Sequence, residues 1–165
     1  VPVTALLCAF KGQSGDGINV AIDAILEAIL CSFSACGSDG IEMTGVLDAS
    51  IYNCIFNSCG GYGINNSSGT NIAARVWRVA NLFYNNTSGQ ENGFGDGPSL
   101  SEQTDSAASF VSSTDLTLAA ASNARNNGLP MGFENETYIG YEDIGAVRHV
   151  DPSGGGPNKL WGKLG

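Results

Sequence analysis

The chain of 165 residues contains few charged residues, and basic ones are scarcest. It has 7 Lys and Arg against 16 Asp and Glu, 14% charged residues in all, and a net charge of −9. The basic residues are scattered and form no stripe that would bind a phosphate backbone, so the composition argues against nucleic-acid binding. The sequence also has no apolar run long enough to span a membrane.

Motifs for several kinds of catalytic and metal site are also missing. There is no CxxC pair, so a zinc site is not indicated. His149 is the only histidine, and no Ser/His/Asp nucleophile arrangement can be assigned. The segment GQSGDG at 12–17 lacks the lysine and the flanking context of a phosphate-binding loop.

The first half of the chain contains a 23-residue repeat. Four columns share this interval, namely Phe10, Phe33 and Phe56; Ile18, Ile41 and Ile64; Cys8, Cys31 and Cys54; and Cys36 and Cys59. A glycine precedes each isoleucine of the second column. A period of this length is typical of a solenoid, in which each repeat forms one coil and equivalent residues stack.

The composition of each repeat favours β-strands. The leucine consensus of leucine-rich repeats is absent, and short β-branched or aromatic runs alternate with Gly and Asn. The segment at 20–30 has an apolar spacing that suits an isolated helix, but it must superpose on a strand-like segment one period later. We therefore predict an all-β, single-stranded, right-handed parallel β-helix of about four coils.

Three details of the coils follow from the same columns. Phe83 lies 27 residues after Phe56, so four extra residues are expected in one corner of the fourth coil. Gly17, Gly40 and Gly63 are expected at a corner that needs positive φ or close backbone approach. Cysteines stacked about 4.8 Å apart are within reach of disulfide formation, but we favour buried free thiols.

The second half resembles the closing segment of a known superfamily. Asp115-Leu116-Thr117-Leu118, Ser122-Asn123-Ala124-Arg125 and Gly128 are similar to a D-F-x-L…S-P-A-x-x-x-G stretch, with Asn123 at the proline position. Asp143-Ile144-Gly145-Ala146-Val147-Arg148 is similar to a terminal D-I-G-A-x-[QR]. Both stretches are typical of right-handed parallel β-helix proteins of the pectate-lyase-like superfamily, and the resemblance extends over about residues 5–150.

The resemblance is specific for the fold and weak for function. The superfamily includes polysaccharide lyases, hydrolases, epimerases, adhesins and phage spikes. It implies a C-terminal cap made of strands and a short helical piece that covers the last coil. We accordingly divide the chain into coils at 1–87, an irregular final coil and cap at 88–150, and a Gly-rich linker with a docking tail at 151–165.

Both ends of the chain are expected to meet partners. The N-terminal coil has no comparable cap, so upstream sequence, another subunit or a different protein is expected to cover its edge. Docking to a partner is also predicted for Lys159, Leu160, Trp161 and Lys163, with Trp161 as the anchor. The alternative for this tail is a disordered terminus, or a segment folded onto its own coil.

Two aspartates recur at one corner of the predicted coils. Asp16 and Asp39 precede their glycines at equivalent positions, whereas Tyr62 takes this position in the third coil. Stacked carboxylates repel each other, which raises one pKa or recruits a cation such as calcium. A glycosidase-type catalytic pair is a further alternative, and the interpretation we favour is that both residues are hydrated.

Basic and aromatic residues near the four-residue insertion form a second candidate site. Lyases of the superfamily use a basic residue to remove a proton beside a uronate carboxylate, often with calcium. Arg75 and Arg78 are the best-placed candidates for this role, and Trp77 with Arg75 would bind a sugar by stacking. The alternative is a surface arginine beside a partly buried tryptophan.

These features favour a non-enzymatic structural module on a virion surface or in an extracellular assembly. The most concrete version is a phage or virus decoration or fibre protein, with other structural proteins or copies of the chain as partners. The resemblance implies that such modules are often trimeric and bind glycans. No cofactor is expected except for the possible calcium. The alternatives are a fragment of a polysaccharide lyase or glycoside hydrolase, and a segment of a secreted adhesin.

Overall fold

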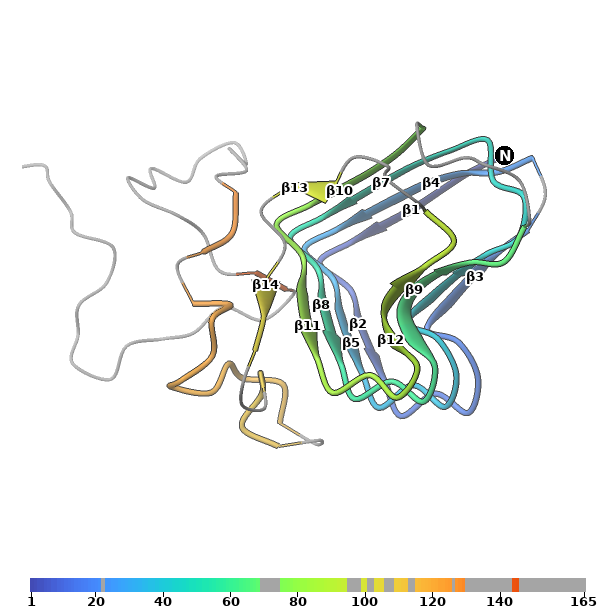
Figure 1. Cartoon of the computed structure of the whole chain (residues 1–165). Coiled ribbons are helices and arrows are strands. Elements are labelled where there is room, and N and C mark those ends of the chain that lie inside the picture. Colours follow the sequence, from blue (N-terminus) through green and yellow to red (C-terminus); the bar gives the residue numbers. More distant parts are fainter. Residues whose placement is uncertain are drawn as a thin grey trace, which may run out of the picture.

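Parallel strands wind this chain into a solenoid of about four turns (Figure 1). The structure is a computed structural model that describes residues 1–21, 23–68, 75–94, 99–100, 103–105, 109–112, 115–125, 127–129 and 144–145. These residues contain no α-helix. The predicted parallel β-helix with its period of about 23 residues is therefore confirmed, and the predicted linker and tail at 151–165 lie outside the described residues.

The strands form three parallel sheets that extend along the solenoid. Sheet A contains β1 (Pro2–Leu6), β4 (Ile25–Ile29), β7 (Asp48–Tyr52), β10 (Val76–Val79) and β13 (Ser99–Leu100). Sheet B contains β2 (Ala9–Lys11), β5 (Ser32–Ser34), β8 (Ile55–Asn57), β11 (Leu82–Tyr84) and β14 (Gln103–Thr104). Sheet C contains β3 (Ile18–Val20), β6 (Ile41–Met43), β9 (Tyr62–Asn66) and β12 (Gly89–Asn92).

A column of phenylalanines fills the interior along sheet B. Phe10 pairs with Phe33 and Phe33 with Phe56, one coil apart. Phe83 continues the column, and successive ring centroids lie 4.8, 4.8 and 5.2 Å apart with nearly parallel planes. The predicted stacking of equivalent residues is confirmed, and the isoleucine column of sheet C obeys the same register.

The ambiguous segment at 20–30 forms a strand. Within it, β4 pairs in register with β1 and β7, and Leu26 and Ala28 point into the core. Burial in the stacked core overrides the helical spacing of this segment. The four extra residues of the fourth coil are also confirmed: β9 follows β6 by 23 residues, but β10 follows β7 by 27, so they lie between β9 and β10.

The corner glycines serve close packing. A Cβ at Gly40 would lie 2.5 Å from Cδ1 of Phe56 and 2.6 Å from the carbonyl oxygen of Gly63. Gly17 and Gly63 have equivalent contacts, and none of the three has a positive φ, so close approach is the correct alternative. Left-handed backbone occurs in two other columns, at Leu7, Leu30, Asn53 and Ala80, and at Gly12, Ala35, Ser58 and Asn85.

The described residues between 109 and 145, which we call the C-terminal segment, pack against the outer face of sheet B, beside β11 and β14 (Figure 1). Ile55 and Leu82 point outward from the sheet and form a second apolar cluster with Phe110, Leu118, Ala124 and Ile144. Among the described residues, β13 and β14 are the strands that continue the sheets beyond the fourth coil. The expected helical piece is absent from the residues described between 88 and 150.

Buried polar groups fasten this segment to the solenoid. The side chain of Asn53 donates to the Leu129 carbonyl at 2.9 Å and accepts from the Leu129 amide at 2.7 Å. The carboxylate of Asp105 accepts hydrogen bonds from the hydroxyls of Ser109 and Ser122 and from the Asn123 amide. Since these groups are buried, each hydrogen bond offsets a desolvation cost.

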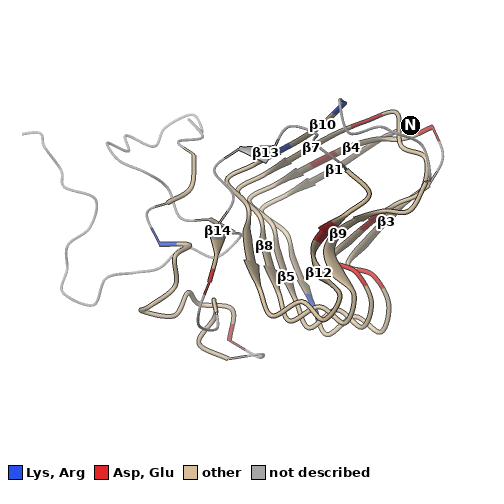
Figure 2. Cartoon of the chain, in the orientation of Figure 1, with Lys and Arg blue, Asp and Glu red and all other residues tan. Residues whose placement is uncertain are grey.

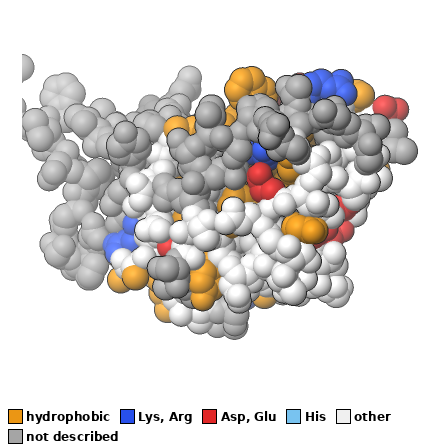
Figure 3. Space-filling view, viewed as in Figure 1, with side chains coloured by type: hydrophobic (Ala, Val, Ile, Leu, Met, Phe, Trp, Pro, Cys, Tyr) orange, Lys and Arg blue, Asp and Glu red, His pale blue; other side chains and the backbone are white. Residues whose placement is uncertain are grey.

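Acidic residues are distributed around the coils, whereas basic residues are few (Figure 2). On the side shown in Figure 3, uncharged polar groups and backbone form most of the described surface, with apolar side chains in small patches. A strongly positive surface is therefore absent from the described part of the chain on this side.

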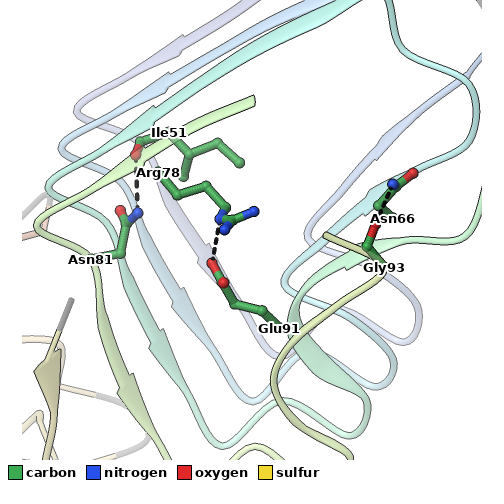
Figure 4. A network of polar contacts seen from close by, with 6 residues as sticks. All are labelled: Ile51, Asn66, Arg78, Asn81, Glu91 and Gly93. Carbon is green, nitrogen blue, oxygen red and sulfur yellow. Dashed lines mark hydrogen bonds and ion pairs between the residues drawn. The ribbon is translucent and has the colours of Figure 1, made fainter. Parts of the chain in front are cut away.

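One ion pair lies inside the solenoid, in the fourth coil (Figure 4). Nε of Arg78 is 3.0 Å from Oε1 of Glu91, and the two side chains are 2% and 17% exposed. The guanidinium also lies 4.0 Å from the ring centroid of Phe94. Arg78 and Glu91 occupy the core positions that Ile51 and Ile64 fill in the third coil, so two core residues have changed together.

Removing one partner of this pair should strongly destabilise the fold. Arg78→Met leaves the Glu91 carboxylate without its counterion, which we expect to cost about 3 kcal/mol in the free energy of unfolding. The double variant Arg78→Ile/Glu91→Ile carries the residues of the third coil, and we expect it to recover most of this loss. Urea unfolding measures both, and a double variant less stable than the single one contradicts the interpretation.

The glycine corner offers a matched comparison. Gly40→Ala forces the new methyl group into Phe56 and the next coil, and we expect a loss of about 2 kcal/mol. A Cβ at Gly15 meets nothing within 4 Å, so Gly15→Ala should leave the melting temperature unchanged or slightly raised. Equal melting temperatures for the two variants would refute the role of close packing.

Candidate functional site

The two predicted corner aspartates link neighbouring coils. Oδ1 of Asp16 accepts the backbone amide of Asp39 at 3.0 Å, and Oδ1 of Asp39 accepts that of Tyr62 at 2.5 Å. The side chain of Asn19 donates to Oδ2 of Asp16, and that of Asn65 donates to Oδ2 of Asp39. Asp39 is buried rather than hydrated, so the favoured interpretation was wrong for this residue.

Hydrogen bonds lower the pKa of Asp16. Burial alone would raise the pKa of this carboxyl, but hydrogen bonds from Asn19, the Asp39 amide and Ser38 together lower it below its usual value. A carboxylate held in this way is a weak proton acceptor. The arrangement at this corner stabilises stacking and leaves little basicity for catalysis.

Glu42 is a carboxyl that sequence reasoning missed. It lies on the outer face of sheet C between Asn19 and Asn65, in a column otherwise occupied by asparagine. Burial raises its pKa, and the nearby Asp39 carboxyl adds to this effect, while hydrogen bonds from Ser67 and Thr44 oppose it. The single acidic residue in an asparagine column was the signal that could have revealed it.

The outer face of sheet A carries the most distinctive exposed side chains. Residues that alternate with the core form three rows along the solenoid: Pro2, Ile25 and Asp48; Thr4, Glu27, Ser50 and Trp77; and Leu6, Ile29, Tyr52 and Val79. We call these three rows the sheet A face. Its third row is apolar, and its second ends in a tryptophan.

Trp77 dominates the sheet A face. Its side chain is 47% exposed and lies opposite Ser50, diagonal to the half-buried Tyr52. Glu27 in the same row accepts a hydrogen bond from the Thr4 hydroxyl at 3.3 Å. The face therefore combines an aromatic surface with a carboxylate two coils away in the same row, a set able to contact both apolar and hydroxyl-bearing groups of one elongated ligand.

The other predicted site residues are separated by the fold. Arg75 is exposed and immediately precedes β10, at the edge of the sheet A face, so it lies close to Trp77 in the chain. Arg78 is in the core and cannot act as a surface base. Asp16 and Asp39 lie at the corner before sheet C, so they do not join Arg75 and Trp77. Lys159, Leu160, Trp161 and Lys163 lie outside the described residues.

All five cysteines are free thiols, as we favoured, and four are buried. A hydrogen bond from Cys54 lowers the pKa of Cys31 to about 7, and one from Cys59 lowers the pKa of Cys36. Burial raises the pKa of Cys54, and Cys36 raises that of Cys59. In each pair one thiol therefore ionises more readily because its neighbour solvates the thiolate.

The part of the chain that the structure describes contains neither a metal cluster nor a membrane-spanning helix. No group of three or more His, Cys, Asp or Glu side chains there is arranged to hold a metal ion. No described helix is long and apolar enough to cross a membrane. Calcium at Asp16 and Asp39 therefore stays a prediction, with only two carboxylates to support it.

Comparison with known proteins finds no matching family model, no curated relative and no similar solved structure. The parallel β-solenoid is established by its three parallel sheets. The resemblance to pectate-lyase-like proteins stays a prediction, and the side chains are the evidence that bears on function.

Glu42 should make stability depend on pH. A folded-state pKa above the unfolded value means that stability falls as pH rises from about 4.5 through the folded pKa, because ionising Glu42 costs more in the folded state. Glu42→Gln retains an acceptor for Ser67 and Thr44 without the charge. We expect the free energy of unfolding of this variant to exceed that of the wild-type chain by about 0.5 kcal/mol at pH 7. The two free energies should be equal at pH values where Glu42 is protonated.

Thermal unfolding of both proteins across the acidic range measures this difference. The low-pH end serves as the internal control, since a protonated Glu42 and Gln then carry the same charge. A difference that is constant with pH, or that grows toward low pH, contradicts the proposed cause.

Proposed function

We propose that this chain is a non-enzymatic surface module that binds neutral glycans through the sheet A face. The half-exposed Trp77 carries the proposal, because it stands on a rigid strand opposite Ser50 and diagonal to Tyr52, with Glu27 two coils away in the same row. Large aromatic side chains on ordered strands present area at little conformational cost. The role suits a decoration or fibre protein of a virion or another extracellular assembly.

The chemistry of the face favours a sugar over an apolar protein surface. An aromatic ring packs against the C–H face of a pyranose, and carboxylates accept hydrogen bonds from its hydroxyls. Burying Glu27 under an apolar partner would leave its charge poorly compensated, which is costly. A hydroxyl-rich ligand supplies the donors that this carboxylate needs.

Charge favours a neutral glycan over an acidic one. Glu27 and Asp48 lie on the face itself, and the whole chain carries a net charge of −9. Arg75 is the basic residue near the edge of the face, and Arg78 is committed to the core. Uronate or sialic acid groups would therefore be repelled more than attracted.

The same observations argue against the enzymatic alternative. Asp16 and Asp39 are engaged by backbone amides of neighbouring coils, and they lie apart from the aromatic face. A retaining glycosidase needs one carboxyl free to attack and one free to donate a proton. Proton abstraction needs a base beside the bound sugar; Arg78 is inside the solenoid, which leaves the exposed Arg75 as the one of the two candidate arginines at the face.

Assembly into a larger particle is part of this proposal. A rigid stack with in-register coils holds an exposed face in a fixed orientation, which suits repeated display. Partners at the N-terminal coil and at the 151–165 tail remain predictions, as does a trimer of the chain. Glycan binding by the isolated chain can be tested without them.

Trp77→Ala should weaken binding of neutral glycans about tenfold or more, because it removes the aromatic surface that packs against the sugar. Val111→Ala is the control, since Val111 is 60% exposed but belongs to the C-terminal segment outside sheet B. Glycan-array screening identifies the ligand, and calorimetry measures the dissociation constants. Stronger binding of acidic glycans, or equal effects of both substitutions, contradicts the proposal.

A degradation assay distinguishes the enzymatic alternative. Polysaccharides incubated with the chain should show no new reducing ends and no unsaturated products. Product formation that is lost in Asp16→Asn or Asp39→Asn would instead identify a hydrolase or lyase.

A further inference from the structure

The cysteines form two columns that share the register of the phenylalanine column. Cys8, Cys31 and Cys54 occupy the same position in successive coils, since the residues that follow them pair in register. The sulfur of Cys31 contacts the carbonyl oxygens of Ile29 and Ala5. That of Cys54 has equivalent contacts with the carbonyls of Tyr52 and Ala28, so the two side chains have the same orientation.

A second column repeats the arrangement. The amide of Gly60 donates to the carbonyl of Cys36 at 2.8 Å, and that of Thr87 donates to Cys59 at 2.9 Å, which fixes these cysteines one coil apart. Both columns end in asparagine in the fourth coil. Asn81 accepts the amide of Cys54, and Asn86 accepts the amide of Cys59, at 3.0 and 2.9 Å.

The repeat of the coils suits a metal ion between two thiolates. Stacked rings in the phenylalanine column repeat at 4.8 Å, and Cys31 and Cys54, whose sulfur atoms have equivalent carbonyl contacts, follow the same register. A disulfide needs its sulfur atoms about 2.05 Å apart, so these parallel side chains would have to turn toward each other. Two metal–thiolate bonds of about 2.3 Å arranged in line span about 4.6 Å, close to the repeat of the coils.

We propose that neighbouring cysteines in each column bind soft monovalent metal ions, Cu(I) or Ag(I), between their sulfur atoms. Thiolates select soft ions, and linear two-coordinate geometry requires only two ligands. Among the described residues no group of three or more His, Cys, Asp or Glu is placed around one metal position, which disfavours four-coordinate zinc. The proposal is independent of glycan binding, because the columns lie in the core.

The binding step conserves oxidation states. Each ion forms two metal–sulfur bonds, two S–H bonds break, and the two protons pass to solvent. Cys31 binds one ion at a time, with either Cys8 or Cys54, because a thiolate sulfur does not bond two ions in line on its opposite sides. The first column therefore holds one ion and the second holds one. Cys8 is only partly buried, which gives ions access to the first column from its N-terminal end.

Silver titration tests the proposal through its stoichiometry. The reduced chain in chloride-free buffer should bind two Ag(I) ions, one per column, and its melting temperature should rise. Cys8→Ala leaves Cys31 and Cys54 as a pair and should still bind two ions. Cys31→Ala removes both pairs of the first column and should bind one, and Cys31→Ala/Cys59→Ala should bind none.

Matched substitutions and a spectroscopic measurement complete the test. Cys8→Ala and Cys31→Ala each remove one thiol, so a model of independent cysteines requires equal losses from both, and that result overturns the proposal. X-ray absorption at the silver edge on the wild-type chain should show two sulfur neighbours, whatever the stability of the variants. Three or more ligands, or a mass loss of two hydrogens per pair without bound silver, also overturns it.

Discussion

In-register stacking of coils at 4.8 Å is the constraint on which the rest of this structure depends. It orders the phenylalanine column, and it brings the backbone of each coil against the next. Gly40 has no side chain because Phe56 and the carbonyl of Gly63 occupy the space that its Cβ would need. Stacking also brings the Asp39 carboxylate to the amide of Tyr62, which turns a charged corner residue into a link between coils. A side chain in this protein is therefore understood from its column as much as from its neighbours in sequence.

Much of the architecture was predictable because identical residues recur at one interval. The phenylalanine and isoleucine columns fix the register, and the register requires the segment at 20–30 to be a strand despite its helical spacing. The left-handed corners were not predictable, since Leu30 and Ala80 have no intrinsic preference for positive φ and adopt it because both flanking strands are held by stacking. The position of the C-terminal segment on sheet B was also missed, because its apolar residues match no column.

The candidate sites divide in the same way. Asp16 and Asp39 were found because they repeat, but repetition alone could not distinguish hydrated corner residues or a calcium site from the hydrogen bonds between coils that these residues form. Trp77 was found from its residue type and its place near the four-residue insertion, and its exposure follows from strand alternation, which places Arg78 inside and Trp77 outside. Glu42 was missed because its raised pKa depends on burial and on the approach of Asp39 from the corner, which are tertiary effects that spacing does not encode.

The fourth coil departs from the pattern in a systematic way, and the departures belong together. Cysteine gives way to Asn81 and Asn86, and core isoleucine gives way to Arg78 and Glu91. Each replacement introduces a polar group whose hydrogen bonds or charge are met within the solenoid: Asn81 by the carbonyl of Ile51 at 3.0 Å, and Arg78 by Glu91. Isolated polar substitutions in a stacked core would each carry a desolvation cost. Paired polar groups keep the coils stacked although they interrupt the cysteine and isoleucine columns, while Phe83 continues the phenylalanine column. The coil that presents Trp77 outward therefore carries polar pairs in its interior beside the apolar core.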